Sequence, residues 1–282
     1  MKWITGFYIL YFFGGCISER QSYLLSPQNN TALPYHAIPM KGDSAGGATY
    51  VSGVFTIGSA NARLTDGVFS FQGNIHRSNN LGPIQIYYGA NLTFGSYLAA
   101  DFYNFSHSPD FYPGTGDSLN HTPTASHSFG SYGLMAGIDL VKTHTHLRKN
   151  TYSEWRILGM ETSLQNEFGN YADYRKNLPD SAMNIIYRKH SYAYLGLYTE
   201  WLWTSRNKIE YGIKLSAGTD LTQTGNYSNY YAYSIFPLYT FSLAYHVRKD
   251  RFLGFFQTNV SNYAANLQMG ISYRLGKARR PS

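Results

Sequence analysis

Apolar and polar residues alternate with a period of two along most of this sequence, starting at Ala48. This period is that of a β-strand whose two faces meet different surroundings. The clearest case lies at 82–96, where Ile84 and Ile86 alternate with Gln85. The pattern predicts an all-β chain. About ten segments can be drawn, the ninth without a clear phase, near 48–58, 66–77, 82–96, 129–143, 152–168, 187–204, 208–219, 230–247, 251–260 and 265–275.

Composition helps to decide what the apolar faces contact. Charged residues make up only 14% of the chain and aromatic residues 17%, with 27 Tyr and 27 Gly. Beyond the N-terminus there is no apolar run long enough for a transmembrane helix. A membrane barrel has this composition, because its strands turn one apolar face to lipid and a polar face to the lumen. The alternative is a soluble, lipid-anchored binding barrel whose apolar faces form a core.

The connections between the segments alternate in length. Short turns are predicted near 78–81, 144–150, 204–208 and 249–251, and the other connections near 59–65, 97–128, 169–186, 220–229 and 261–264. Except for the last of these, this is the pattern of short periplasmic turns and long extracellular loops. We therefore expect residues 48–276 to form a single antiparallel, up-and-down transmembrane β-barrel of about ten strands, within a range of eight to twelve.

Aromatic residues and the closing segment agree with this prediction. Five outward-facing aromatic residues lie close to short turns or to the chain end and would form a periplasmic girdle at the headgroup level: Trp201, Trp203, Tyr211, Tyr245 and Tyr273. The run 267–276, Leu-Gln-Met-Gly-Ile-Ser-Tyr-Arg-Leu-Gly, resembles the terminal strand of outer-membrane β-barrel proteins of Bacteroidetes-type bacteria. The resemblance implies an outer-membrane location and names no activity. The chain departs from that pattern by continuing into a basic tail, 277–282.

The N-terminus has the features of a secretory signal peptide. Residues 1–15 hold a lysine, an apolar stretch and small residues. Phe13-Gly14-Gly15-Cys16 resembles the lipobox of bacterial lipoproteins, with Phe in place of the usual Leu. The resemblance implies cleavage before Cys16, acylation of that residue and an anchor in the inner leaflet, with 16–47 as a lipid-anchored tether. The alternative is an ordinary signal peptide with an incidental cysteine. Because Cys16 is the only cysteine, neither an intrachain disulfide nor a cysteine zinc site can form.

Ionisable residues on the predicted polar faces are candidate lumen residues. They would form either a selectivity ring or proton site, or a paired charge network that fills a narrow barrel. We expect the charge network, made of His76, Asp139, Glu161, Glu200, Glu210, Lys214, His246 and Arg274. Tyrosines in the long loops are candidates for a partner-binding surface, because Tyr offers contact area at low entropy cost: Tyr171, Tyr174, Tyr227, Tyr230 and Tyr231.

Basic residues gather at the short turns and in the tail, where they would contact anionic lipid or a periplasmic partner: Lys142, Arg148, Lys149, Arg206, Lys208, Arg248, Lys249, Arg251, Lys277, Arg279 and Arg280. The net charge of +7 is therefore spread over turns and does not predict a nucleic-acid surface.

No cofactor, metal or catalytic motif stands out in the sequence. Loop 97–128 does crowd potential hydrolase residues, but in no spacing that a mechanism requires: Ser106, His107, Asp110, His121, Ser126, His127 and Ser128. We expect a non-enzymatic outer-membrane β-barrel lipoprotein, a structural or accessory component of an outer-membrane complex. The alternatives are a narrow channel for ions or small solutes and a surface-exposed hydrolase.

Overall fold

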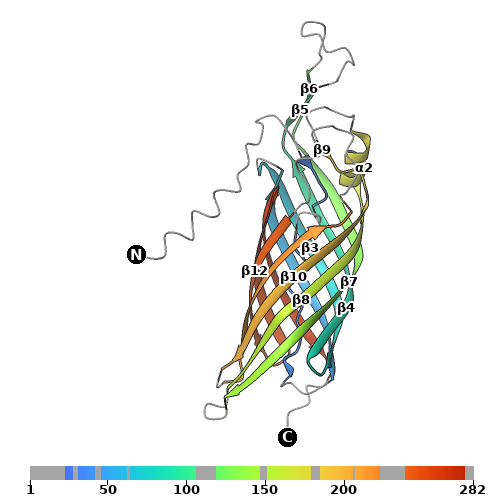
Figure 1. Cartoon of the computed structure of the whole chain (residues 1–282). Coiled ribbons are helices and arrows are strands. Elements are labelled where there is room, and N and C mark those ends of the chain that lie inside the picture. Colours follow the sequence, from blue (N-terminus) through green and yellow to red (C-terminus); the bar gives the residue numbers. More distant parts are fainter. Residues whose placement is uncertain are drawn as a thin grey trace.

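Ten antiparallel strands close into one barrel in the computed structural model (Figure 1). The structure describes residues 23–27, 31–41, 46–61, 64–105, 119–146, 151–178, 185–205, 207–222 and 239–276. Each barrel strand pairs with the next along the chain, and β14 closes the barrel on β2. The predicted all-β, up-and-down barrel is confirmed. Its strands are β2 (Gly47–Ala60), β3 (Asp66–Leu81), β4 (Ile84–Ala99), β7 (Ala125–His146), β8 (Thr151–Phe168), β10 (Ser191–Thr204), β11 (Glu210–Asp220), β12 (Tyr239–Lys249), β13 (Phe252–Ser261) and β14 (Ala264–Leu275).

The two ends of the barrel differ in their connections. One end carries the turns at Gly82-Pro83 and 250–251 and the end of β14, and it is the periplasmic end by the rule for such barrels. The turn at 262–263 is equally short but lies at the opposite end. The opposite end carries the small elements seen at the top of Figure 1. They are the two-strand pairs β1 (Tyr23–Leu24) with β9 (Ile185–Ile186) and β5 (Phe102–Phe105) with β6 (Leu119–Thr122), and the helix α2 (Asn170–Asn177). Within the described residues, no helix is long and apolar enough to cross a membrane.

One turn lies at a different position from the sequence prediction. The turn expected at 78–81 lies at Gly82-Pro83, where Gly82 takes the positive φ that a two-residue turn requires. The described part of β12 begins at Tyr239, and the earlier part of the segment predicted near 230–247 lies outside the described residues. The shifted turn lies at strand ends, where the alternation of side chains no longer reports the backbone path.

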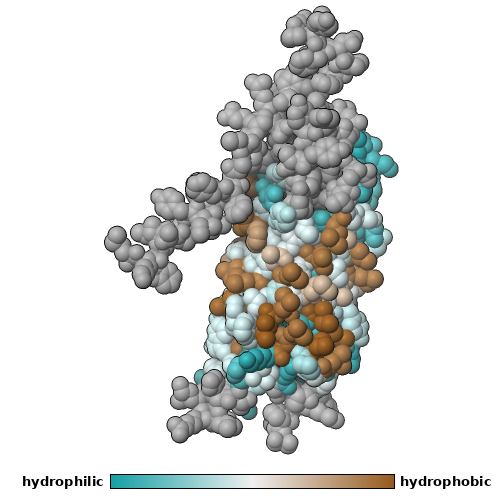
Figure 2. All heavy atoms as spheres, viewed as in Figure 1, coloured by the Kyte–Doolittle hydropathy of each residue, from teal (hydrophilic) through white to brown (hydrophobic). Residues whose placement is uncertain are grey.

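Apolar side chains lie outside the barrel and polar side chains inside it, the reverse of a soluble fold. Leu134 and Ile271 are 64% and 63% exposed, whereas Gln85 and Glu161 are completely buried. Figure 2 shows the apolar side chains gathered in a band across the visible face of the barrel. Only a lipid environment favours so much outward apolar surface on a closed barrel. The chain therefore spans a membrane.

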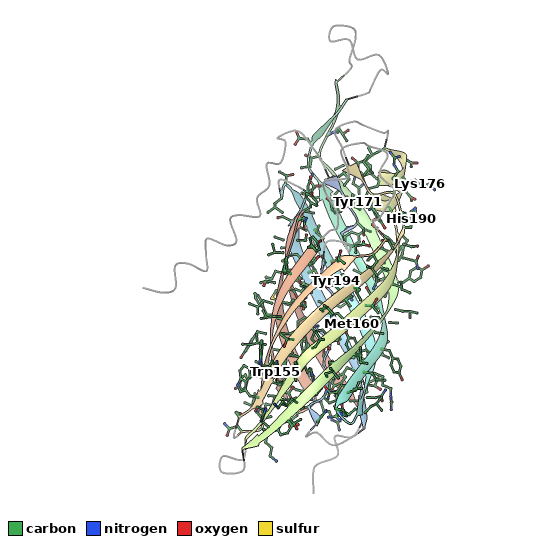
Figure 3. All side chains as sticks on the ribbon, viewed as in Figure 1. Trp155, Met160, Tyr171, Lys176, His190 and Tyr194 are labelled. Atoms are coloured by element: carbon green, nitrogen blue, oxygen red, sulfur yellow. The ribbon has the colours of Figure 1, made fainter. Side chains whose placement is uncertain are left out.

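The predicted aromatic girdle lies on the outer surface near the periplasmic end. Trp201 stacks on Trp155 with ring centroids 6.1 Å apart, and Trp203 stacks on Tyr211 at 6.0 Å. Figure 3 places Trp155 close to this end. The sequence prediction did not include Trp155, because a β-bulge changes the phase of β8. Ile157 and Leu158 both face outward and the register shifts there, so residues before the bulge have the opposite orientation from that expected.

Candidate functional site

Part of the chain occupies the lumen of the barrel. Residues 31–41, named here the lumen segment, lie inside the barrel, and all of 32–40 are buried although they form no regular secondary structure. The sequence had predicted residues 16–47 to be a lipid-anchored tether and had placed none of them in the lumen, where the structure puts residues 31–41. The physical reason is that a ten-stranded barrel with a polar inner wall offers hydrogen-bond partners to an extended chain that cannot pair with itself.

The barrel wall binds the main chain of the lumen segment. Gln257 Nε2 donates to the Leu33 carbonyl at 3.0 Å, and Gln85 Nε2 donates to the Pro39 carbonyl at 3.0 Å. His76 Nε2 lies 2.8 Å from the Ala37 carbonyl, and Arg156 Nη2 donates to the Ile38 carbonyl at 3.0 Å. At the periplasmic end the Lys41 backbone N–H donates to Glu154 Oε2 at 2.8 Å. These contacts take the place of the backbone hydrogen bonds that a strand would form with its neighbours.

Arg156 is the centre of the buried charge network. Its guanidinium is fully buried and binds Glu200, and its Nε also donates to Gln85 Oε1 at 3.1 Å. Glu154 Oε1 lies 3.6 Å from Nη2 and Asp139 Oδ1 lies 4.0 Å from Nε. Because Arg has five donors in a fixed fork, it can hold several carboxylates and a main-chain carbonyl together.

Tyr35 connects the lumen segment to a second part of the network. Its hydroxyl donates to Glu200 Oε1 at 2.8 Å, and its ring stacks on His246 at 4.4 Å. His246 lies between two carboxylates, 3.6 Å from Glu200 and 3.7 Å from Glu210. Glu210 also binds the Arg248 guanidinium. The Tyr35 ring of the lumen segment thus packs beside the ion pairs of the barrel wall.

A third group surrounds Lys214. Its Nζ lies 2.5 Å from Glu161 Oε2 and 4.1 Å from the centre of the Tyr198 ring. The Tyr87 hydroxyl donates to the same Glu161 oxygen at 3.1 Å, and the Tyr198 hydroxyl donates to Asp139 Oδ2 at 2.9 Å. His36 of the lumen segment stacks on Tyr87 with centroids 5.4 Å apart. The lumen charges are therefore paired, as buried charges require.

All eight residues predicted for the lumen network are buried: His76, Asp139, Glu161, Glu200, Glu210, Lys214, His246 and Arg274. Sequence reasoning missed Arg156 and Glu154, since the bulge in β8 reverses their face. It also placed Arg248 with the basic residues of the turns, but Arg248 is buried and binds Glu210. The alternation of Phe241, Leu243 and Val247 along β12 does put Arg248 on the polar face, so this signal was available.

The tyrosines predicted to bind a partner have other roles where the structure describes them. Tyr171 is buried, stacks on Tyr97 at 4.0 Å and donates to the Leu25 carbonyl at 3.2 Å. It therefore fastens α2 to the chain entering the lumen, and it is not a free surface. Tyr227, Tyr230 and Tyr231 lie outside the described residues.

Tyr174 lies half-buried on α2. It stacks on His127 with centroids 4.1 Å apart. Burial raises the pKa of the Tyr171 phenol, and burial together with the Asp66 carboxylate raises the pKa of Tyr174 to about 12. Both phenols therefore stay neutral. Figure 3 places Tyr171 with Lys176 and His190 at the extracellular end of the barrel.

The described part of loop 97–128 does not bring a serine and a histidine together. Ser126, His127 and Ser128 follow one another in β7, so the histidine points to the opposite face from both serines. Ser126 Oγ lies 2.8 Å from Ser96 Oγ, on the exposed side. Ser106, His107 and Asp110 lie outside the described residues, as does the side chain of His121. Within the described residues, no group of three or more potential ligands could hold a metal ion.

Comparison with known proteins finds similarity in fold only. No family model and no curated protein matches this chain. The β-domain of the Bordetella autotransporter BrkA is 10% identical, with a TM-score of 0.38, and the match covers 83% of this chain and 100% of that one. The translocator domain of the autotransporter NalP from Neisseria meningitidis is 11% identical, with a TM-score of 0.32 and coverage of 83% and 91%. The KdgM porin is 7% identical, with a TM-score of 0.26 and coverage of 80% and 99%.

All three TM-scores are low, so the location follows from the chain's own geometry. A closed barrel with an outward apolar band and a periplasmic aromatic girdle is the architecture of proteins that span the bacterial outer membrane. The protein is an outer-membrane β-barrel.

Proposed function

We propose that this protein is a non-conducting, non-enzymatic outer-membrane barrel that serves as a structural or accessory component of an outer-membrane complex. The observation that carries this proposal is the filled lumen. The lumen segment lies along the barrel interior, and its carbonyls accept hydrogen bonds from the wall at four levels. An ion crossing the barrel would have to displace this segment and separate buried charge pairs, which is energetically costly.

The extracellular end is the proposed site of contact with a partner protein. The periplasmic turns at Gly82-Pro83 and 250–251 have two residues each, whereas the connections 100–124 and 169–190 contain the added elements β5, β6, β9 and α2. In Figure 1 the β5–β6 pair projects beyond the barrel strands. Such built-out connections on a rigid barrel are where proteins place recognition. Outer-membrane lipid contacts the apolar band and the girdle.

A narrow channel remains the second candidate, favoured by one feature of the lumen segment. Residues 32–40 form no strand, and wall side chains supply their main-chain contacts. The ten-strand ladder therefore does not depend on the segment, and its release would leave a closed barrel with a polar interior.

Conductance in planar bilayers tests the proposed function. The full-length protein is expected to show no steady open current. A full-length variant in which residues 32–40 are replaced by Gly and Ser, with the length kept, should show frequent openings because the side chains that fill the lumen are gone. Lys142→Ala, at an exposed position of β7, serves as a control and should stay closed. A steady open current from the unmodified protein would instead support the channel.

A further inference from the structure

The lumen segment runs in one direction through the barrel. The chain first lies at the extracellular end, where β1 pairs with β9 and the Leu24 carbonyl accepts from the Tyr187 backbone N–H at 3.0 Å. Thr31 then contacts Asn266, which lies at the extracellular start of β14. Pro39 contacts Gln85, next to the periplasmic turn at Gly82-Pro83, and Lys41 reaches Glu154. As the residue number increases along the segment, its contacts with the wall lie closer to the periplasmic end.

We infer that the barrel displays the chain N-terminal to Tyr23 on the outer face of the membrane, and that its lumen is built to accept an extended polypeptide. The chain enters the lumen from the extracellular end and reaches β2 at the periplasmic end. The chain that precedes Tyr23 therefore joins the described residues on the extracellular side of the membrane. This inference goes beyond the proposed function, although the same segment carries both. It adds a function, surface presentation of the protein's own N-terminal region.

The chemistry of the wall matches a polypeptide main chain. Gln257, His76, Arg156 and Gln85 all contact carbonyl oxygens of the segment. Carbonyl oxygens are common to every amino acid, so these contacts do not depend on the sequence that passes them. Tyr35 and His36 add specific contacts that hold the final register, through Glu200 and Tyr87.

The inference changes the predicted position of the anchor at Cys16. Cys16 is seven residues before Tyr23, and seven extended residues reach about 25 Å. To return to the inner leaflet, this stretch would have to cross an apolar band about 25 Å tall with its backbone unpaired in lipid. The lumen, the other route, is already filled. Any acyl chains on Cys16 would therefore insert from the extracellular side.

Labelling of whole cells tests this topology. One epitope tag is inserted between residues 20 and 21, and the same tag is inserted after residue 44 as the matched control at the other end of the lumen segment. Both full-length proteins are first checked for heat-modifiable migration on gels. We expect the first tag to bind antibody equally in intact and permeabilised cells, and the second only after permeabilisation. A first tag reached only after permeabilisation, or a second tag reached on intact cells, would overturn the inference.

A second measurement keeps the test decisive if a tag prevents folding. Gln21→Cys and Ser44→Cys, each in the full-length chain, are treated with a membrane-impermeant maleimide and compared with the unmodified protein. Only Gln21→Cys should add labelling on intact cells; the opposite result overturns the inference. Failure here, with the unmodified protein non-conducting in bilayers, would leave the proposed function standing. A surface-labelled Gln21→Cys together with a steady open current would overturn the proposed function and keep the topology.

Discussion

The barrel wall contacts two parts of the lumen segment with different chemistry, named here the charged half (residues 35–41) and the neutral half (residues 31–34). Around residues 35–41 the wall is charged, with Arg156 and Lys214 placed among buried carboxylates. Around residues 31–34 it is neutral: Asn266 Nδ2 donates to Thr31 Oγ1 at 2.8 Å, and Gln257 donates to the Leu33 carbonyl. A cavity of about 10 Å³, the size of one water, lies beside this neutral stretch.

The difference indicates where the lumen segment is held most firmly. Hydrogen bonds with a charged partner are roughly twice as strong as neutral ones, and a buried charge that loses its partner is costly. The charged half should therefore set the register of the segment, while the neutral half guides it at lower cost. A segment that enters from the extracellular end meets the neutral half first and the charged half last, where Lys41 contacts Glu154 at the periplasmic end.

The largest effect is expected from Arg156→Met. This change leaves Glu200, Asp139 and Glu154 without their common cation, and breaking a buried ionic network by removing one partner costs about 3–5 kcal/mol. The free energy of unfolding is measured in lipid vesicles by urea titration, followed by tryptophan fluorescence. The exposed Lys142→Met is the control and should change it by less than about 0.5 kcal/mol. If Arg156→Met matched that control, the charged half would not be the stronger one.

The next effect should come from Lys214→Met, alone and combined with Glu161→Gln. The single change leaves the Glu161 carboxylate buried, with the Tyr87 hydroxyl as its remaining side-chain donor among the described residues, so we expect a loss of about 3 kcal/mol. The double variant should lose less than the sum of the two single variants, by about 0.5–3 kcal/mol, because neither partner is then left charged and unpaired. The same urea titration measures all three. Strict additivity would contradict a direct ionic contact.

The smallest effect is expected in the neutral half, from Gln257→Ala. The amide donates to the Leu33 carbonyl and to Asn259 Oδ1, both uncharged acceptors, so a loss of about 1 kcal/mol is expected. Thr258→Ala, on the outward face of the same strand, is the matched control. If Gln257→Ala were as destabilising as Arg156→Met, the charged half would not hold the lumen segment more firmly than the neutral half.

Much of the fold could be predicted because each barrel strand has two unlike faces. Side chains such as Phe69 and Leu134 needed lipid while Gln72 and Glu161 needed polar partners, and a period of two assigns each to its face without knowledge of the neighbouring strands. The failures lie where that period is interrupted. At the bulge of Ile157 and Leu158 one extra residue reverses the face of Arg156, and only the register against β7 and β10 reveals it.

The sequence alone predicted an all-β barrel of about ten strands, because apolar and polar residues alternate along most of its segments. Composition and the lengths of the connections then favoured lipid over a soluble core as the surroundings of the apolar faces. What occupies the lumen was decided only by the tertiary structure. Residues 31–41 have no periodicity, and the wall residues that bind their main chain are distant in sequence; Tyr35 meets Glu200 across 165 positions. Closure of the barrel creates the set of inward donors at Gln85, Arg156 and Gln257 that makes burial of this segment favourable. Since no local pattern encodes that set, the path of the N-terminal chain could be seen only in the folded molecule.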